Sequence, residues 1–213
     1  MPRTSRHAPG GMIFHVLNRG VGRRTLFHKD GDYAAFERLM REALARVPGV
    51  RLLAYCLMPN HWHQLVWPSA DAELTDYLRW LTHTHTQRYH AHYHTAGTGH
   101  LYQGRFKSFP IEADENLQIV ARYVKRNALR ANLCARAEAW RWGSLWRRVR
   151  GGSDGLLSTA AWPIPMPTLG EWVERVNEPQ SAAELDALRR SVVRSCPFGG
   201  AAWRERVARE LGL

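Results

Sequence analysis

The sequence predicts an α+β protein with a ferredoxin-like fold, in which a β-α-β-β-α-β antiparallel sheet has helices on one face and is followed by a small helical C-terminal extension. Two observations carry this prediction. Short apolar segments of strand character alternate with longer segments of helical periodicity, in the order strand, helix, strand, strand, helix, strand. The length of 213 residues suits one domain with a small appendage.

The first half of the pattern runs from the first strand to a hairpin. Met12–Asn18 has the composition of a strand, and Asp30–Arg46 carries apolar residues at helical spacing. A Pro-Gly pair ends this helix, and Val50–Leu57 is the second strand. A Pro-Asn turn leads into the third strand, His61–Trp67, which we expect to pair antiparallel with the second.

The second half of the pattern begins with a helix near Asp71 that continues into polar residues. Phe106–Ile111 is a short fourth strand. The acidic pair Asp114-Glu115 then marks the start of a helix that runs through Ala128, because acidic side chains favour the first turn of a helix. These elements complete the ferredoxin-like order and add one helix after it.

A glycine-rich segment, Gly151–Gly155, is typical of a linker and divides the chain into residues 1–150 and residues 151–213. The second part is predicted to be helical. Ser181 and Glu184 form a capping-box pattern, and a last helix is expected at Trp203–Leu211.

Charge is distributed unevenly between these two parts. The chain has 30 Lys and Arg against 19 Asp and Glu, a net charge of +11. Residues 1–150 hold 23 basic and 11 acidic residues, whereas residues 151–213 hold 7 and 8. Almost all of the basic residues are arginine, whose planar fork suits phosphates and base edges. Nucleic acid is therefore the leading partner class, and the alternative is a solubilising basic surface or the bias of a high-GC genome toward arginine.

Other classes of protein are disfavoured by composition. An apolar content of 45% argues against a disordered basic tail, and no segment is long and apolar enough to be a membrane span. The three cysteines are far apart in the sequence, which indicates neither a disulfide framework nor a zinc ribbon. We expect a cytoplasmic, nucleoid-associated protein.

Histidines occur in three groups with His-x-His spacing. Residues i and i+2 of a strand share a face, so His61 and His63 can converge on one metal ion. His83 and His85 lie on a helical segment, where we expect them to face solvent or phosphate. The group at 90–94 precedes glycines and is expected in a flexible loop. A single His-x-His motif also occurs as two polar residues on an exposed strand face, so it needs supporting residues.

Three ordered segments provide that support: Tyr55–His63 (Tyr-Cys-Leu-Met-Pro-Asn-His-Trp-His), Gly99–Ser108 and Arg122–Ala131. Together they resemble the single-tyrosine HUH transposases, and within these the REP-associated tyrosine transposases, over about residues 10–150. The resemblance implies a ferredoxin-like domain that binds a folded single-stranded DNA hairpin and cuts beside it with a tyrosine and a divalent metal. The family pattern Asn-Pro-Val-Arg-Ala-Gly differs here, at Asn127–Asn132, by loss of the proline and the glycine, which leaves the length of that helix open.

The residue types are consistent with this chemistry. Tyr123 and Asn127 are four apart on the expected helix and therefore share a face. With His61 and His63, the Asn127 oxygen would ligate Mg²⁺ or Mn²⁺ and leave positions open for phosphate and water. Tyr123 would attack phosphorus to give a 5′-phosphotyrosine and a free 3′-hydroxyl, without ATP. Asn127 has a second interpretation, as a helix cap.

DNA contacts are expected from basic and polar residues near these motifs. A solvated turn or an exposed strand end explains some of them equally well. The candidates are Arg19, Arg23, Arg24, Gln103, Arg105, Lys107, Arg122, Lys125, Arg126 and Arg130.

The sequence therefore predicts a metal-dependent single-stranded DNA endonuclease and strand transferase that acts at REP-type hairpins. One alternative is a domesticated hairpin-binding protein that needs no catalysis, and the intact His61, His63, Tyr123 and Asn127 argue against it. A zinc hydrolase is another, disfavoured because strand 61–67 has no Cys, Asp or Glu. The hairpin sequence and the choice between monomer and dimer stay open.

Overall fold

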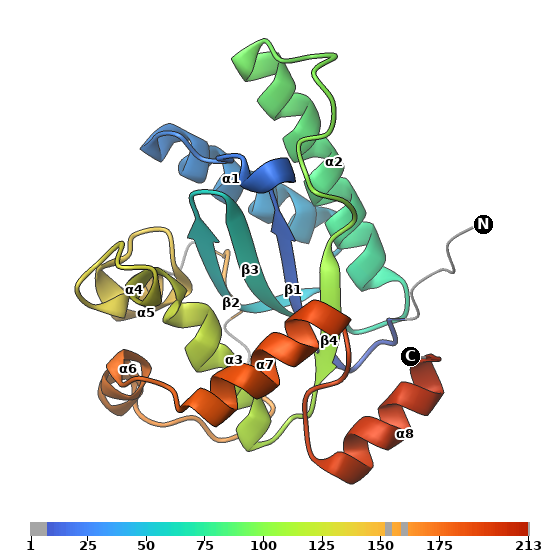
Figure 1. The fold of residues 1–213 in the computed structure, drawn as a ribbon, viewed down its shortest axis with the longest axis vertical. Coiled ribbons are helices and arrows are strands. Elements are labelled where there is room, and N and C mark those ends of the chain that lie inside the picture. The colour runs from blue at the N-terminus through green and yellow to red at the C-terminus, as the bar shows by residue number, and fades with distance from the viewer. Residues whose placement is uncertain (1–7, 152–154, 159–161, 213) are drawn as a thin grey trace.

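The computed structural model describes residues 8–151, 155–158 and 162–212. A four-stranded sheet with the strand order β2-β3-β1-β4 lies at its centre (Figure 1). Its strands are β1 (Ile13–Arg19), β2 (Arg51–Met58), β3 (His61–Trp67) and β4 (Lys107–Ile111), and all neighbours are antiparallel. The predicted ferredoxin-like sheet is confirmed, with every strand within one residue of its expected bounds.

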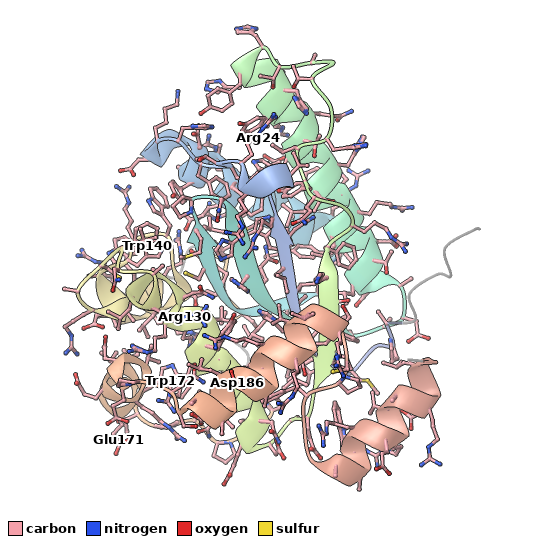
Figure 2. The ribbon with its side chains drawn as sticks, in the orientation of Figure 1. Arg24, Arg130, Trp140, Glu171, Trp172 and Asp186 are labelled. Carbon is pink, nitrogen blue, oxygen red and sulfur yellow. The ribbon has the colours of Figure 1, made fainter. Side chains whose placement is uncertain are left out.

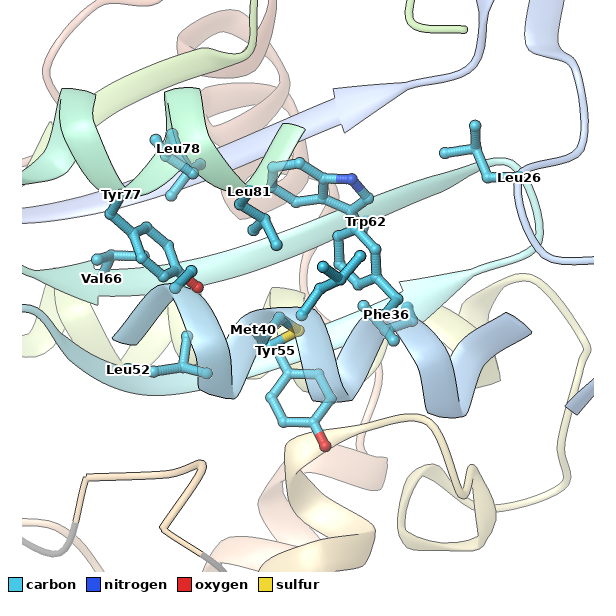
Figure 3. Close-up of a cluster of buried hydrophobic side chains, with 14 of the residues drawn as sticks. Leu26, Phe36, Met40, Leu52, Tyr55, Trp62, Val66, Tyr77, Leu78 and Leu81 are labelled. Atoms are coloured by element: carbon cyan, nitrogen blue, oxygen red, sulfur yellow. The ribbon is translucent and has the colours of Figure 1, made fainter. Parts of the chain in front are cut away.

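Two crossover helices, α1 (Asp30–Arg46) and α2 (Glu73–Tyr93), cover one face of this sheet. Their apolar stripes meet strand residues such as Trp62 and Val66 in a buried cluster (Figure 3). Helix α2 is longer than expected, because the 90–94 histidines that were assigned to a loop continue it and His94 ends it in a left-handed conformation. A short 3-10 turn, η1 (Val21–Arg23), links β1 to the segment before α1.

The opposite face of the sheet is covered by α3 (Glu115–Lys125) and α4 (Asn127–Arg130). Leu65 and Phe109 point to this face and pack against α3 residues such as Val120 and Val124. The predicted arrangement, with helices on one face of the sheet, therefore holds for the two crossover helices. It omits the helices that cover the other face. The strands carry apolar side chains on both faces, so both faces need a covering layer.

The region after α4 forms further helices, and all of them except α8 contribute to this second layer. These are η2 (Ala137–Ala139), α5 (Ser144–Val149), α6 (Leu169–Asn177), α7 (Ala182–Arg194) and α8 (Ala201–Leu211). The expected capping box at Ser181 and Glu184 begins α7, and α6 begins with a similar one. Trp172, Val176 and Leu188 are buried in the same cluster as α3, so the extension shares the core of the sheet's second face.

Residues 152–154 of the expected linker lie outside the described residues, and the division into 1–150 and 151–213 stays a prediction. Helix α8 lies at the outer side of the extension (Figure 1), after a segment in which Phe198 pairs in parallel with Ile111. Within the described ranges, no helix combines the length and apolarity required to span a bilayer.

Candidate active site

The histidines of β3 face the α3 layer. Alternation along the strand turns His61 and His63 to this face and turns Trp62 and Gln64 to the other. The ring centroids of His61 and His63 are 5.0 Å apart and the rings are nearly perpendicular. His63 is buried, whereas His61 is half-buried at the end of the strand that pairs with Arg19. The two side chains therefore share a face and lie together.

A third histidine, His15 on β1, joins this group. Its Nε2 lies 2.9 Å from Nδ1 of His63, and the two rings stack with an interplanar angle of 12°. His15 is fully buried, and burial lowers its pKa to about 3. His15 is not among the site residues predicted from the sequence. The available signal was a polar side chain in the middle of an otherwise apolar strand, on the same face as Ile13 and Leu17.

Hydrogen bonds orient the two β3 imidazoles. Nδ1 of His61 donates to Oδ1 of Asn60 at 2.6 Å, and Nδ1 of His63 is held by His15. Among the described residues, Nε2 of His61 and Nε2 of His63 have no hydrogen-bond partner. An imidazole fixed through one nitrogen presents the other to a ligand, as metal-binding histidines do.

The electrostatics of the site keep these imidazoles neutral. Burial, assisted by the positive charges of Arg19 and Arg130, lowers the pKa of His61 to about 4. Burial also lowers the pKa of His63 well below its usual range, assisted by His15 and His61. A neutral imidazole is the form that binds a metal ion, so both rings are ready to bind one near neutral pH.

Tyr123, in the last turn of α3, lies against the histidines. Its ring is perpendicular to that of His63 at 5.7 Å between centroids and nearly perpendicular to that of His15 at 6.1 Å. Only 7% of the tyrosine is exposed. The guanidinium of Arg130 lies 4.4 Å from the ring centroid, and the residue lies near the end of α3 (Figure 2). The structure thus brings a phenol, two oriented imidazoles and a guanidinium together.

Asn127 occupies a different position from the one that the sequence suggests. The helix expected to run through Ala128 ends at Lys125, and Asn127 begins the short helix α4. Its Oδ1 accepts a hydrogen bond from Arg130 Nη2 at 3.2 Å, while its Nδ2 is buried without a partner. The Nδ2 group of Asn127 therefore lacks a hydrogen-bond acceptor, which a group bound at the site would supply.

The fit of a divalent ion can be judged from these donors. Among the described residues, no three His, Cys, Asp or Glu side chains are arranged so that they could hold a metal ion by themselves. The two free Nε2 atoms suit Mg²⁺ or Mn²⁺ only when oxygen ligands complete the shell. The predicted oxygen ligand, Asn127, accepts one hydrogen bond from Arg130, and its oxygen keeps a second lone pair that a metal ion would use. The histidine pair and this oxygen therefore fit a divalent ion whose remaining ligands are phosphate and water oxygens.

Several predicted DNA-binding residues lie on the surface near β1. Arg23, Arg24, Gln103 and Arg105 are exposed, as is Arg130. Arg19 is half-buried and opposite His61 in the sheet. The backbone of Gln103 is tied to β1 by its N–H, which donates to Arg19 O at 2.9 Å. Arg19 and Gln103 therefore lie at the end of β1 that adjoins His61.

The three DNA contacts predicted at the end of α3 stay predictions, and in the structure these side chains have partners within the chain. Arg122 Nη2 donates to Glu178 O at 3.1 Å, and Arg126 Nη1 donates to Asn177 O at 3.0 Å. Lys125 is buried, with its Nζ 4.8 Å from the Trp172 ring centroid and 5.1 Å from that of Trp162. These three side chains hold the extension against α3. The helical spacing of these basic residues in the sequence does not show which of them are covered by a later part of the chain.

Two further expectations change in the same way. Lys107 is exposed, but its Nζ donates to Val193 O of α7 at 3.2 Å. His85, expected to face solvent or phosphate, is buried, and its Nδ1 lies 2.6 Å from the Tyr102 hydroxyl. The Tyr102 hydroxyl also accepts a hydrogen bond from Trp62 Nε1 at 3.1 Å. The length of α2 places His85 on the inner side of the helix, where it anchors the segment that contains Tyr102.

Comparisons with known proteins identify the family. The family model described as "Transposase IS200 like" matches residues 10–127. The chain belongs to the IS200-like transposase family. No curated protein matches the sequence significantly.

Solved structures extend the comparison to the fold. A REP-associated tyrosine transposase bound to a REP hairpin has a TM-score of 0.53 and 17% identity, covering 85% of this chain and 100% of that chain. A candidate transposase from Deinococcus radiodurans R1 has a TM-score of 0.38 and 16% identity, covering 55% of this chain and 92% of that chain. The family resemblance in the sequence motifs is confirmed, and the fold is shared with the REP-associated structure.

Proposed function

We propose that this transposase is a metal-dependent endonuclease and strand transferase for single-stranded DNA that acts at REP-type hairpins. Tyr123 is the nucleophile and forms a 5′-phosphotyrosine intermediate. His61, His63 and Asn127 hold the divalent ion, Mg²⁺ or Mn²⁺. The observation that carries the proposal is the contact of the Tyr123 ring with His63, whose free Nε2 lies on a face shared with His61.

The protein residues have distinct tasks in this reaction. The oxygen of Tyr123 attacks phosphorus, a new P–O bond forms to tyrosine, and the bond from phosphorus to the 3′-oxygen breaks. The phenol gives up its proton, and the departing oxygen gains one and becomes a free 3′-hydroxyl. The phosphotyrosine conserves the bond for rejoining, so the chain needs no ATP.

Positive charge around the tyrosine supports phosphate binding. The guanidiniums of Arg19 and Arg130 are close enough to lower the pKa of His61, so they also act on a phosphate at this place. A bound divalent ion supplies polarisation of the scissile phosphate and offsets the charge that develops there. His15 holds the His63 ring in position, and Asn60 does the same for His61.

The DNA partner is inferred from charge and from the relative of known structure. The net charge of +11 favours a polyanion, and most of the excess lies before residue 151. The similar REP-associated transposase is described as bound to a REP hairpin. A hairpin with single-stranded flanks is therefore the substrate class that we propose for this chain.

Denaturing gel electrophoresis tests the proposal. A labelled single-stranded DNA that contains the hairpins flanking the gene should form a covalent adduct with the parent protein in the presence of Mg²⁺ or Mn²⁺. Tyr123→Phe keeps the ring and deletes the nucleophilic oxygen, so the adduct and the cleavage should both disappear while hairpin binding persists.

Two outcomes would contradict the proposal. Cleavage without any adduct in the parent protein, unchanged in Tyr123→Phe, would indicate attack by water, as in a metal-dependent hydrolase. Binding without cleavage by the parent protein, with either metal, would favour a pure hairpin-binding protein. The double variant His61→Ala/His63→Ala tests the metal assignment, because cleavage at the parent rate would exclude these ligands.

A further inference from the structure

One groove of the described structure lies beside α2. It has a volume of ≈ 690 Å³ and runs between α2 and the segment of residues 100–106. We name it the α2 groove. Its walls include Arg79, Thr82 and His83 from α2, and His100, Arg105 and Phe106 from the 100–106 segment.

A second groove adjoins the α2 groove. It has a volume of ≈ 630 Å³, runs along the end of β1, and includes Arg19. We name it the β1 groove. The two grooves share Asn18, Gln103, Gly104 and Arg105 in their linings. Arg19, which lines the β1 groove, pairs with His61 in the sheet, so the β1 groove includes a direct strand neighbour of the histidine pair.

The 100–106 segment is built into the fold and does not depend on a ligand for its position. Val21 N–H donates to Leu101 O and Gln103 N–H donates to Arg19 O, each at 2.9 Å. Tyr102 anchors the segment from below through its buried hydroxyl, which contacts His85 and Trp62. The groove is thus largely preformed, as binding sites for small ligands usually are.

The chemistry of the walls selects a nucleotide. Phe106 and the α2 face offer apolar surface for stacking, while His83, His100 and Gln103 offer polar atoms to base edges. Thr82 uses its hydroxyl within α2, where it donates to Leu78 O at 2.7 Å, so this wall is less polar than its composition suggests.

Arginines at the rim complete the match to a nucleotide. Arg105 is exposed on the segment that both grooves share. Arg79 is also exposed and pairs with Asp76 at 3.0 Å, and such an exposed pair contributes little and gives way readily to a phosphate. The groove combines a stacking surface, polar atoms and positive charge in a volume suited to one nucleotide.

We propose that the α2 groove binds the base of an unpaired deoxynucleotide of the DNA strand whose backbone follows the β1 groove to the scissile phosphate. This inference rests on the proposed function, because it takes single-stranded DNA as the substrate. It adds a site for an unpaired base at a distance from the chemistry, and assigns stacking to Phe106, base-edge contact to His83 and phosphate contact to Arg105.

Binding to two oligonucleotides tests the assignment. The probes are oligo(dT) and an abasic oligomer of equal length, which share the backbone charge and differ only in the bases. Both are measured by fluorescence anisotropy with the Tyr123→Phe protein, so that cleavage plays no part. The Tyr123→Phe protein should bind oligo(dT) more tightly than the abasic oligomer. Adding Phe106→Leu or His83→Ala should reduce this ratio of affinities by about five- to a hundred-fold.

Matched controls separate the groove from the rest of the surface. His92→Ala removes another exposed histidine of α2 outside the groove and should leave the preference unchanged. Arg105→Ala should weaken binding of both probes equally, because it acts on the backbone. Equal binding of both probes by the starting protein, or an unchanged preference in the Phe106 and His83 variants, would overturn the proposal.

A second measurement requires no substitution in the groove. Oligo(dT) containing 4-thiothymidine should crosslink on irradiation to residues of α2 or the 100–106 segment, and crosslinks confined to other regions would refute the site. Failure of the phosphotyrosine assay would refute the proposed function while leaving this base preference in place. Loss of the base preference with normal cleavage would refute only the groove.

Discussion

Replacing Arg147 of α5 by methionine is expected to destabilise the protein by about 3–5 kcal/mol, because it leaves a buried carboxylate unpaired. Arg147 Nη2 pairs with Oε2 of Glu37 on α1, and the Glu37 side chain is only 7% exposed. Tyr55 of β2 donates to the other oxygen of Glu37 at 2.6 Å, and Arg147 Nε donates to Tyr55 at 2.8 Å. One buried network thus joins α1, β2 and α5.

An exposed ion pair provides the internal control. Arg88 of α2 donates to both oxygens of Glu42 at 3.1 and 2.8 Å, with side chains that are 55% and 42% exposed. Arg88→Met should cost no more than about 1 kcal/mol, since water solvates the remaining charge. The two variants remove the same kind of ion pair, so the difference between their losses in unfolding free energy measures the effect of burial.

Thermal unfolding followed by circular dichroism measures both variants. The Arg147 variant should show a Tm lower by about 6–20 °C, given about 2–4 °C per kcal/mol for a chain of this size. Replacing all three network residues, as Glu37→Met, Tyr55→Phe and Arg147→Met together, should recover most of the lost stability because no polar group is left unpaired. Equal costs for Arg147→Met and Arg88→Met, or a triple variant as unstable as Arg147→Met, would refute the reasoning.

Other predictions concern the site and its surroundings. His15→Phe should lower Mn²⁺ affinity by about 10–100-fold in calorimetric titration while the fold persists, because it removes the group that orients His63. Metal-dependent cleavage, measured against pH, should continue well below pH 6.5, because burial lowers the pKa of His61 to about 4; loss of activity centred at 6.5 would contradict this. Burial also lowers the pKa of Lys125 well below its usual range. Between the folded-state pKa and the higher unfolded-state pKa, the lysine binds a proton in the unfolded chain but not in the folded protein. The free energy of unfolding therefore falls as pH drops through this interval. Lys125→Met should remove this pH dependence from urea unfolding curves. Removing one phosphate contact, as in Arg24→Ala, should lower the slope of log affinity for single-stranded DNA against log salt by about 0.7.

The strands and the histidine–tyrosine arrangement were predictable because each depends on local periodicity. Strand alternation alone puts His61 and His63 on one face, and helical periodicity puts Tyr123 on the apolar side of α3. The position of His15 next to His63 depends instead on the pairing of β1 with β3, in which Leu17 lies opposite His63. Register between strands distant in sequence is set by packing of the whole sheet and leaves little trace in either strand alone.

The roles of the basic residues were the hardest to predict. Arg122, Lys125 and Arg126 resemble DNA-binding residues in the sequence, because a positive charge near a catalytic motif has the same appearance whether phosphate or a helix C-terminus satisfies it. In the fold, Arg122 and Arg126 donate to the last carbonyls around the end of α6, a place that favours cations. Only the docking of the extension, more than fifty residues later, distinguishes the two cases.

The docking of the extension also limits the direction from which DNA can reach the tyrosine. Pro179, Gln180 and Leu185 of the extension line the small cavity beside Tyr123, so this side of the ring is covered by protein. Exposed arginines remain at the end of β1 and on the 100–106 segment, the side on which His61 ends its strand. We expect a phosphate approaching there to contact Arg19 first, since this residue pairs with His61 at the end of β1. The positive charge that steers DNA is therefore expected along the β1 edge, and charge reversal at Arg24 should slow association far more than charge reversal at Arg175 on α6, which already pairs with Gln118. Stopped-flow association rates at low salt measure this difference, and equal slowing by the two variants would place the DNA path over the extension instead.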